Sequence, residues 1–183
     1  MRGRDGEQIH DARPACAPPG PAAADDDLVI RGAKPEDAAA VTEVVMAAYG
    51  HYVERLGRRP APMLDDYEAV IRDHDAHVLA AGERIVGLLV LIPQGQGLLL
   101  DNVAVHPDYQ GRGWGRRLVA LAEAAARRGG AAFIWLYTNE KMTEDIRLYT
   151  RLGYVETERV TVQGYRRVCM RKELQDDAGS VPA

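Results

Sequence analysis

The sequence predicts an α/β (α+β) fold, with a mixed and mostly antiparallel central sheet and helices on both of its faces. Two patterns support this prediction. Several short runs are rich in β-branched and apolar residues, as strands are, whereas other segments carry apolar residues at the spacings of three and four that helices show. In chain order these segments run β-α-α-β-β-β-α-β-α-β-β. Only the strand–helix–strand unit in the middle requires a parallel pair, and a gap in the sheet is expected where the pairing changes.

The N-terminal half is expected to form one strand, two helices and a three-stranded antiparallel meander. Leu28–Arg31 is a short β-branched run that predicts the first strand. A helix is expected from Lys34 to about Tyr49, because apolar residues recur there at spacings of three and four. The following elements are assigned to a helix at 64–73 and to strands at 77–81, 84–92 and 98–105.

The C-terminal half is expected to contribute two helices, a strand and a closing hairpin. The first helix follows Gly115 and ends at Arg128, where cations and two glycines form a typical stop signal. The remaining elements are assigned to a strand at 132–138, a helix at 142–152 and a hairpin at 154–162 and 165–172.

The folded domain is expected to span residues 28–174, between a disordered leader at 1–27 and a disordered tail at 175–183. The leader is rich in Pro, Ala, Gly and Asp and has no apolar periodicity. Neither the leader nor any other segment has the apolar run of a signal peptide or of a membrane helix, which needs about 20 residues. A cytoplasmic protein without membrane association is therefore predicted.

Charge and cysteine content argue against several classes of protein. The net charge is −4, and the leader carries three arginines against six acidic residues, so that the rest of the chain is nearly neutral. A nucleic-acid-binding protein would show a basic field instead. The two cysteines, Cys16 and Cys169, provide neither a disulfide framework nor the spacing of metal ligands. We therefore expect no nucleic-acid partner and no metal.

A glycine-rich turn between a strand and a helix is the most informative stretch. Gly111, Gly113 and Gly115 stand at alternate positions just where the helix begins. Backbone N–H groups at a helix N-terminus and the positive end of the helix dipole suit a phosphate. The turn lacks the Gly-Lys-Ser/Thr sequence of NTPase phosphate loops and the third glycine of dinucleotide-binding turns. Its alternative role is a tight link between strand and helix. The arginines that add positive charge are Arg112, Arg116 and Arg117.

With the strand before it, the element order and a downstream Tyr-x-x-x-Gly-Tyr block, this turn resembles that of the GNAT superfamily of acyl-CoA-dependent N-acyltransferases. The resemblance covers about residues 28–174, and the family signature falls on Gln110, Gly113 and Gly115. It implies acetyl-CoA as co-substrate, with the pantetheine arm along the strand and the pyrophosphate on the N–H groups of the turn. The implied cofactor-binding residues are Val103, Ala104, Val105, Gln110, Gly111, Arg112, Gly113, Trp114, Gly115, Arg116, Asn139 and Met142.

The same resemblance implies that Tyr149 donates a proton to the departing coenzyme A thiolate. Tyr149 shares a helical face with Ile146 and Leu152, so its alternative role is that of a core tyrosine. Met142 stands where the family often has Asn, seven residues before this tyrosine, and Asn139 is the candidate to replace that contact.

The general base and the substrate contacts are less constrained. Asp101 is the candidate base, because it is the only carboxylate on the strand before Val103 and alternation places it on the face of Val103 and Val105. The alternative role of the Asp101 carboxylate is structural, as the partner of a neighbouring arginine or of the backbone. The segment at 50–63 either lines a substrate pocket or forms a surface turn. Within it, Tyr52 and Glu54 are the candidate substrate contacts.

The resemblance implies transfer of an acetyl group from acetyl-CoA to a primary amine, by direct attack in a ternary complex. The acceptor is expected to be a small-molecule or peptide amine. The alternative is a non-catalytic acyl-CoA-binding sensor or regulatory module, and the presence of both Tyr149 and Asp101 favours the enzyme. The exposed edge of the hairpin at 154–174 allows a homodimer.

Overall fold

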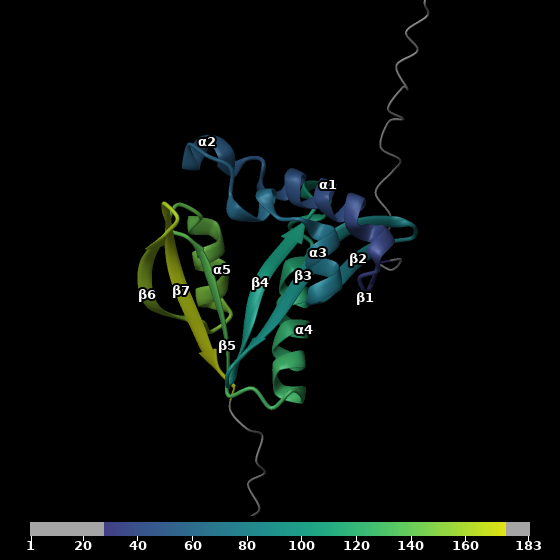
Figure 1. The fold of residues 1–183 in the computed structure, drawn as a ribbon. Helices are drawn as coiled ribbons and strands as arrows, with labels where there is room; N and C mark the ends of the chain where they lie inside the picture. The colour runs from purple at the N-terminus through teal and green to yellow at the C-terminus, as the bar shows by residue number, and fades with distance from the viewer. Residues whose placement is uncertain (1–27, 175–183) are drawn as a thin grey trace, which may run out of the picture.

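One seven-stranded sheet runs through the computed structural model, which describes residues 28–174; Figure 1 shows how its strands are arranged. The strands stand in the order β1-β2-β3-β4-β5-β7-β6. Their bounds are Leu28–Gly32 for β1, Asp75–Ala81 for β2, Arg84–Gln94 for β3, Gly97–Val105 for β4, Phe133–Asn139 for β5, Val155–Val162 for β6 and Tyr165–Glu173 for β7. All neighbouring pairs are antiparallel except β4 and β5. The predicted fold class is confirmed, whereas the predicted leader and tail lie outside the described residues.

Helices cover both faces of the sheet (Figure 1). They are α1 (Ala38–Tyr49), α2 (Tyr52–Leu56), α3 (Tyr67–Asp73), α4 (Trp114–Arg128) and α5 (Thr143–Arg151), with 3₁₀ turns η2 (Pro35–Asp37), η3 (Ala61–Leu64) and η4 (Pro107–Tyr109). The apolar faces of α1 and α3 pack on one side of the sheet around the buried Val41 and Val90. Those of α4 and α5 pack on the other side around Leu118 and Leu136. Between residues 28 and 174, no helix has the length and apolar character needed to cross a membrane.

The connection between α1 and α3 differs from the prediction. Residues 50–63 contain the short helix α2, and the next helix begins at Tyr67 rather than Leu64. Gly57 caps the C-terminus of α2, and its φ of 73° is the left-handed conformation that favours glycine. Its five residues are too few to show a helical period, so the sequence pattern did not reveal it.

Strands β4 and β5 separate soon after they meet. They pair only between Gly97–Leu99 and Phe133–Trp135, and Figure 1 shows the two strands diverging from there. An added Cβ at Gly97 would overlap the Phe133 ring, so a larger residue at this position would require that ring to move. On its other edge, β4 stays paired with β3. The gap expected at the change of pairing is therefore present.

A buried amide ties β4 to the helices on one face. Asn102 is only 4% exposed. Its Oδ1 accepts a hydrogen bond from the Tyr49 hydroxyl at 2.9 Å, and its Nδ2 donates to the Tyr67 hydroxyl at 3.0 Å. Tyr67 in turn donates to the Pro62 carbonyl at 2.8 Å. One side chain therefore holds α1, α3 and η3 against the strand that borders the gap.

Asn102→Leu is expected to lower the free energy of unfolding by about 1–3 kcal/mol, because two largely buried tyrosine hydroxyls lose a partner. Urea denaturation of the variant beside the wild type measures this change. Thr42→Val removes an exposed hydroxyl that bonds only to the Ala38 carbonyl of its own helix. This control is expected to change the free energy by no more than about 0.5 kcal/mol. An unchanged free energy in Asn102→Leu would show that the amide does not hold the helices on the strand.

Candidate active site

A pocket of about 620 Å³ occupies the gap between β4 and β5. Its borders are the glycine-rich turn before α4, helix α5, and residues 50–64, which we call the roof segment. Val103 reaches it from the α4 side of the sheet and Tyr137 from the α1 side, so the pocket passes through the sheet. Its volume is typical of ligand sites. The sequence-predicted residues in its lining are Tyr52, Asp101, Val103, Ala104, Val105, Gln110, Gly111, Gly113, Gly115, Arg116, Asn139, Met142 and Tyr149.

At one end of the pocket, three glycines leave the backbone bare where α4 begins. Gly111 and Gly113 have φ angles of 76° and 84°, which favour glycine. Gly115 has no such constraint, and an added Cβ at any of the three would meet no atom of the described chain within 4 Å. The first hydrogen bond of α4 runs from the Arg117 N–H to the Gly113 carbonyl, so the helix itself does not use the N–H groups of its first turn. Open space beside these donors suits an anion.

Two residues of the predicted cofactor set lie outside the pocket lining. The Trp114 side chain is buried in the core beside α4, with 4% of its surface exposed. The Arg112 guanidinium carbon lies 5.5 Å from the centre of the Tyr109 ring, on the exposed side of the turn. The role implied for both residues is that of their backbone N–H groups in the turn, which these side-chain positions leave open, so it stays a prediction. Arg116 does line the pocket and brings a positive charge to it.

The edge of β4 that faces the gap has carbonyl groups held by side chains. The Val105 carbonyl accepts a hydrogen bond from Gln110 Nε2 at 2.8 Å. The Val103 carbonyl accepts a longer one, at 3.4 Å, from the Tyr49 hydroxyl. In the described chain, no residue of β5 pairs with β4 beyond Leu99. An extended ligand can therefore add to this edge in the manner of a strand.

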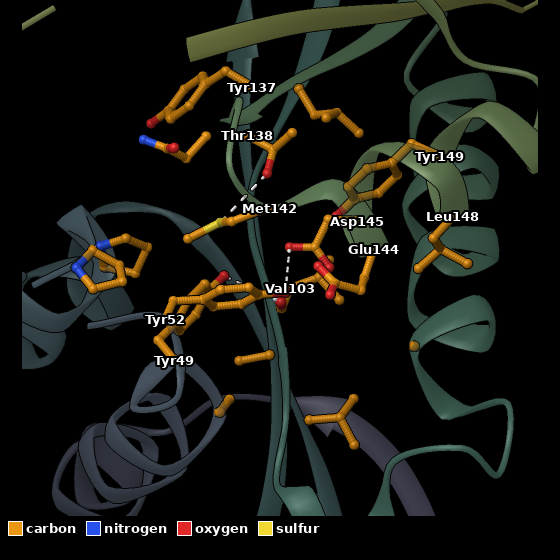
Figure 2. A pocket seen from close by; sticks show the side chains of 18 of the residues that line it. Tyr49, Tyr52, Val103, Tyr137, Thr138, Met142, Glu144, Asp145, Leu148 and Tyr149 are labelled. Atoms are coloured by element: carbon orange, nitrogen blue, oxygen red, sulfur yellow. Dashed lines mark hydrogen bonds between the residues drawn. The ribbon is translucent and has the colours of Figure 1, made fainter. Parts of the chain in front are cut away.

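Tyr149 projects from α5 into the pocket (Figure 2). Its ring also packs edge-on against Tyr154, with the ring centres 5.7 Å apart, so it contributes to the core as well. Among residues 28–174, its hydroxyl has no hydrogen-bond partner. Burial, followed by the negative charge of Asp145, raises the pKa of Tyr149. The phenol is therefore protonated at neutral pH and available as a donor.

Asp145 is a pocket residue that the sequence pattern did not single out. It lies one helical turn before Tyr149, and Figure 2 shows its carboxylate beside the Tyr149 hydroxyl. The Tyr52 hydroxyl donates to its Oδ2 at 3.4 Å. Burial is the largest influence on this carboxyl group and raises the pKa of Asp145 to about 6. The spacing of four from Tyr149 was the only signal in the sequence.

Hydrogen bonds join the roof segment to α5 and to the β6–β7 hairpin. Arg55 donates to the Glu144 carboxylate at 2.7 Å, and this hydrogen bond lowers the pKa of Glu144 to about 2. Tyr165 of β7 donates to the Arg59 carbonyl at 2.8 Å. These contacts hold the roof over the gap.

Of the two predicted substrate contacts in the roof segment, only one reaches the pocket. Tyr52 is buried and lines it. Glu54 is exposed and lies outside the lining, because α2 turns this side chain toward solvent. The prediction for Glu54 is therefore corrected. Of the two roles considered for residues 50–63, the structure supports the pocket lining.

Asp101 lies on a different side of β4 from the predicted one. A β-bulge between β3 and β4 makes it an extra residue of the strand. Its Oδ1 accepts a hydrogen bond from the Tyr137 hydroxyl at 2.8 Å, on the side of the sheet that carries α1. Val103 and Val105 pack on the opposite side with α4. The expectation that Asp101 shares a face with them is wrong, because the bulge interrupts the alternation.

Asn139 and Met142 both reach the pocket from the chain between β5 and α5. The Asn139 Oδ1 accepts a hydrogen bond from the Lys141 N–H at 3.0 Å, which shapes the turn. The Met142 sulfur accepts one from the Thr138 hydroxyl at 3.5 Å. Within the part of the chain that the structure describes, no group of three or more His, Cys, Asp or Glu side chains could hold a metal ion.

Comparison with known proteins gives a consistent result. The model of the acetyltransferase (GNAT) family matches residues 40–154, more than half of the chain. The fold is similar to that of the PaiA N-acetyltransferase from Thermoplasma acidophilum in complex with coenzyme A, with a TM-score of 0.66 and 16% identity over 80% of this chain and 99% of that one.

Two further solved structures are similar. The ribosomal-protein-S18-alanine N-acetyltransferase from Escherichia coli has a TM-score of 0.64 and 20% identity, over 85% of this chain and 99% of that one. A protein from Salmonella typhimurium, solved with its cofactor acetyl-CoA, has a TM-score of 0.61 and 22% identity, over 84% of this chain and 97% of that one. At these identities, the likeness shows a shared fold.

The raised pKa of Asp145 makes stability depend on pH. An ordinary aspartate titrates near pH 3.9, so between about pH 4 and pH 6 the folded protein keeps a proton that the unfolded chain has released. The contribution of Asp145 to the free energy of unfolding should therefore fall as the pH rises through this window. Asp145→Asn removes this effect. As the pH rises from about 4, the free energy of unfolding of the variant is expected to increase relative to that of the wild type, and the difference should become constant above about pH 7.

Urea denaturation of both proteins from pH 4 to pH 8 measures this difference. Glu144→Gln is the matched control, because the lowered pKa of Glu144 predicts the opposite sign: its carboxylate stabilises the fold above its unfolded pKa. A difference between Asp145→Asn and the wild type that does not change with pH would contradict the raised pKa.

Proposed function

The chain belongs to the acetyltransferase (GNAT) family, as its resemblance indicated, and we propose that it transfers an acetyl group from acetyl-CoA to a primary amine. The observation that carries this proposal is the pocket between β4 and β5, which joins an anion-binding turn to Tyr149 and Asp101. The transfer is a direct attack in a ternary complex. Cys169, the cysteine of the described chain, is buried outside the pocket lining, which supports direct transfer over an acetylated cysteine.

The residues present fit a coenzyme A thioester. The N–H groups between Gln110 and Arg116 would bind the pyrophosphate, with added charge from Arg116. Gly115 supports this assignment: its backbone conformation does not require glycine, and the space beside it is open for a group that approaches the backbone closely. The pantetheine arm would lie along the open edge of β4 at Val103–Val105, as an added strand does.

The side chains beyond this edge supply the proton transfers. Acetyl-CoA would provide the thioester carbonyl that an amine attacks. Asp101 accepts the proton that the amine nitrogen loses as the nitrogen–carbon bond forms. Tyr149 donates its phenolic proton to the sulfur as the carbon–sulfur bond breaks, because its hydroxyl is protonated and faces the pocket (Figure 2).

The raised pKa of Tyr149 makes it a weaker acid. The same surroundings would also raise the pKa of a coenzyme A thiol bound beside it. Burial raises the pKa of a phenol and that of a thiol. The charge of Asp145 also raises both, since each group becomes negative when it loses a proton. Proton transfer from Tyr149 to the sulfur depends on the difference between the pKa of the phenol and that of the thiol. Because both pKa values rise, this difference changes less than either value.

Gly115→Ala is expected to weaken acetyl-CoA binding by at least about tenfold, because its methyl group would occupy the space through which the ligand approaches the backbone. The unliganded variant should be no less stable than the wild type, since alanine favours a helix over glycine by up to about 1 kcal/mol. Isothermal titration calorimetry measures the affinity, and thermal unfolding without ligand measures the stability.

Gly32→Ala is the control for this experiment, because an added Cβ there also meets no atom of the described chain within 4 Å. Gly32 lies at the end of β1, far from the pocket in the strand order, so this variant should keep the wild-type affinity. Equal affinity in Gly115→Ala and the wild type would contradict the role of the turn. If acetyl-CoA does not bind to the wild type, the proposed function is wrong.

Tyr149→Phe is expected to lower kcat by about 10²–10⁴-fold with little change in KM for acetyl-CoA, because the proton donor is lost while the binding surface remains. An acceptor is first found by screening amines for release of free thiol. Tyr154→Phe removes the hydroxyl of the neighbouring ring outside the pocket lining and should keep the wild-type kcat. An unchanged kcat in Tyr149→Phe would rule out the donor role. Binding of acetyl-CoA without turnover on any amine would favour the binding module instead.

A further inference from the structure

We propose that the acceptor amine also carries a carboxylate group, as an amino acid does, and that Arg167 binds this carboxylate. The inference rests on the proposed acetyl transfer and names the chemical class of its acceptor. Three neighbouring side chains in the pocket lining carry it: Asp101 of β4, Tyr137 of β5 and Arg167 of β7.

These three side chains form a row across the sheet. The Tyr137 hydroxyl donates to Asp101 at 2.8 Å at one end of the ring. The guanidinium carbon of Arg167 lies 4.0 Å from the centre of the same ring. Strand β5 stands between β4 and β7 in the sheet, so the acid and the cation approach the tyrosine from the two neighbouring strands. The pocket therefore contains opposite charges separated by one aromatic ring.

Arg167 is prepared to bind a carboxylate that the described chain does not supply. Within residues 28–174 it has no ion-pair partner, whereas the adjacent Arg166 pairs with Glu140 at 3.1 Å. The guanidinium carbon lies over the Tyr137 ring, and within residues 28–174 no carboxylate or carbonyl oxygen accepts a hydrogen bond from its N–H groups. Arg167 is half-buried, and a planar carboxylate can bind it through two parallel hydrogen bonds.

The Asp101 end of the row suits the amine. In the described chain, the carboxylate of Asp101 has a neutral tyrosine as its partner and no cation. A second carboxylate, Asp65, lies nearby just beyond the roof segment, and partial burial together with the charge of Asp101 raises the pKa of Asp65. The acceptor would be attracted here in its ammonium form; it loses one proton to water to become the neutral amine, and Asp101 accepts the second proton as the nitrogen–carbon bond forms.

Arg167, at the other end of the row, disfavours acceptors that carry no carboxylate. A polyamine would bring a second positive charge toward Arg167, which is unfavourable. A simple monoamine would leave the guanidinium without an anion. An amine that also carries a carboxylate satisfies both ends at once.

Rates with free amino acids and with the amides of the same amino acids test this inference, since the members of each pair differ in one carboxylate. For the best pair, kcat/KM for the acid should exceed that for the amide by about tenfold to a hundredfold. Arg167→Gln should remove most of this preference, and Arg167→Lys should retain part of it. Arg166→Gln removes the same charge one residue away, where Glu140 holds it, and should leave the preference unchanged. An amino acid and its amide also differ in the basicity of the amine. This difference is the same for every variant, so it cancels when the acid-to-amide ratio of a variant is compared with that of the wild type.

Equal kcat/KM for acids and amides in the wild type would overturn the inference, as would an unchanged preference in Arg167→Gln. Acetylation restricted to amines without a carboxylate would overturn it as well. The acetyl-CoA affinity of Arg167→Gln should equal that of the wild type, which shows that the fold and the cofactor site are intact. Failure of the proposed function has a different signature: no amine of any class, with or without a carboxylate, would release thiol from acetyl-CoA.

Discussion

Beyond Leu99, strand β4 keeps β3 on one edge but has no strand of the described chain on the other, and the organisation of the site depends on this loss of pairing. Backbone groups inside a protein need partners, and side chains provide some of them: Gln110 bonds to the Val105 carbonyl and Tyr49 to the Val103 carbonyl. Asn102 holds the same strand against α1 and α3. The strand therefore stays extended where its neighbour departs, and the gap remains open for an extended ligand.

The pocket in this gap has different chemistry at its two ends. The glycine-rich turn presents N–H donors and Arg116, which suits a phosphorylated ligand. The face that carries α1 presents carboxylates, tyrosines and Arg167. Asp145 and Tyr149 lie on α5, which borders the same pocket (Figure 2). A polar cofactor and a charged acceptor can thus approach from opposite sides of the sheet and meet where it is open.

Local patterns were sufficient to predict most of the fold and the place of the glycine-rich turn before α4, because periodicity and glycine spacing are properties of short segments. Features that depend on tertiary contacts were not predictable. The bulge at Asp101 arises from pairing with β3, and it moved this carboxylate to the other face. The raised pKa of Asp145 comes from burial, and the significance of Arg167 comes from the carboxylate it lacks within the described chain. Glu54 was expected at the pocket, but the orientation of α2 turns it to solvent.

Exchange of backbone amide hydrogens with and without acetyl-CoA tests the central claim most directly: that the open edge of β4 and the glycine-rich turn bind one coenzyme A thioester together. Bound ligand should slow the exchange at residues 100–105 and 110–116, because amides in both segments gain acceptors or lose access to water. Strands β1 and β2, at the far end of the sheet, should show little change. Binding of acetyl-CoA without slower exchange in these two segments would contradict the account.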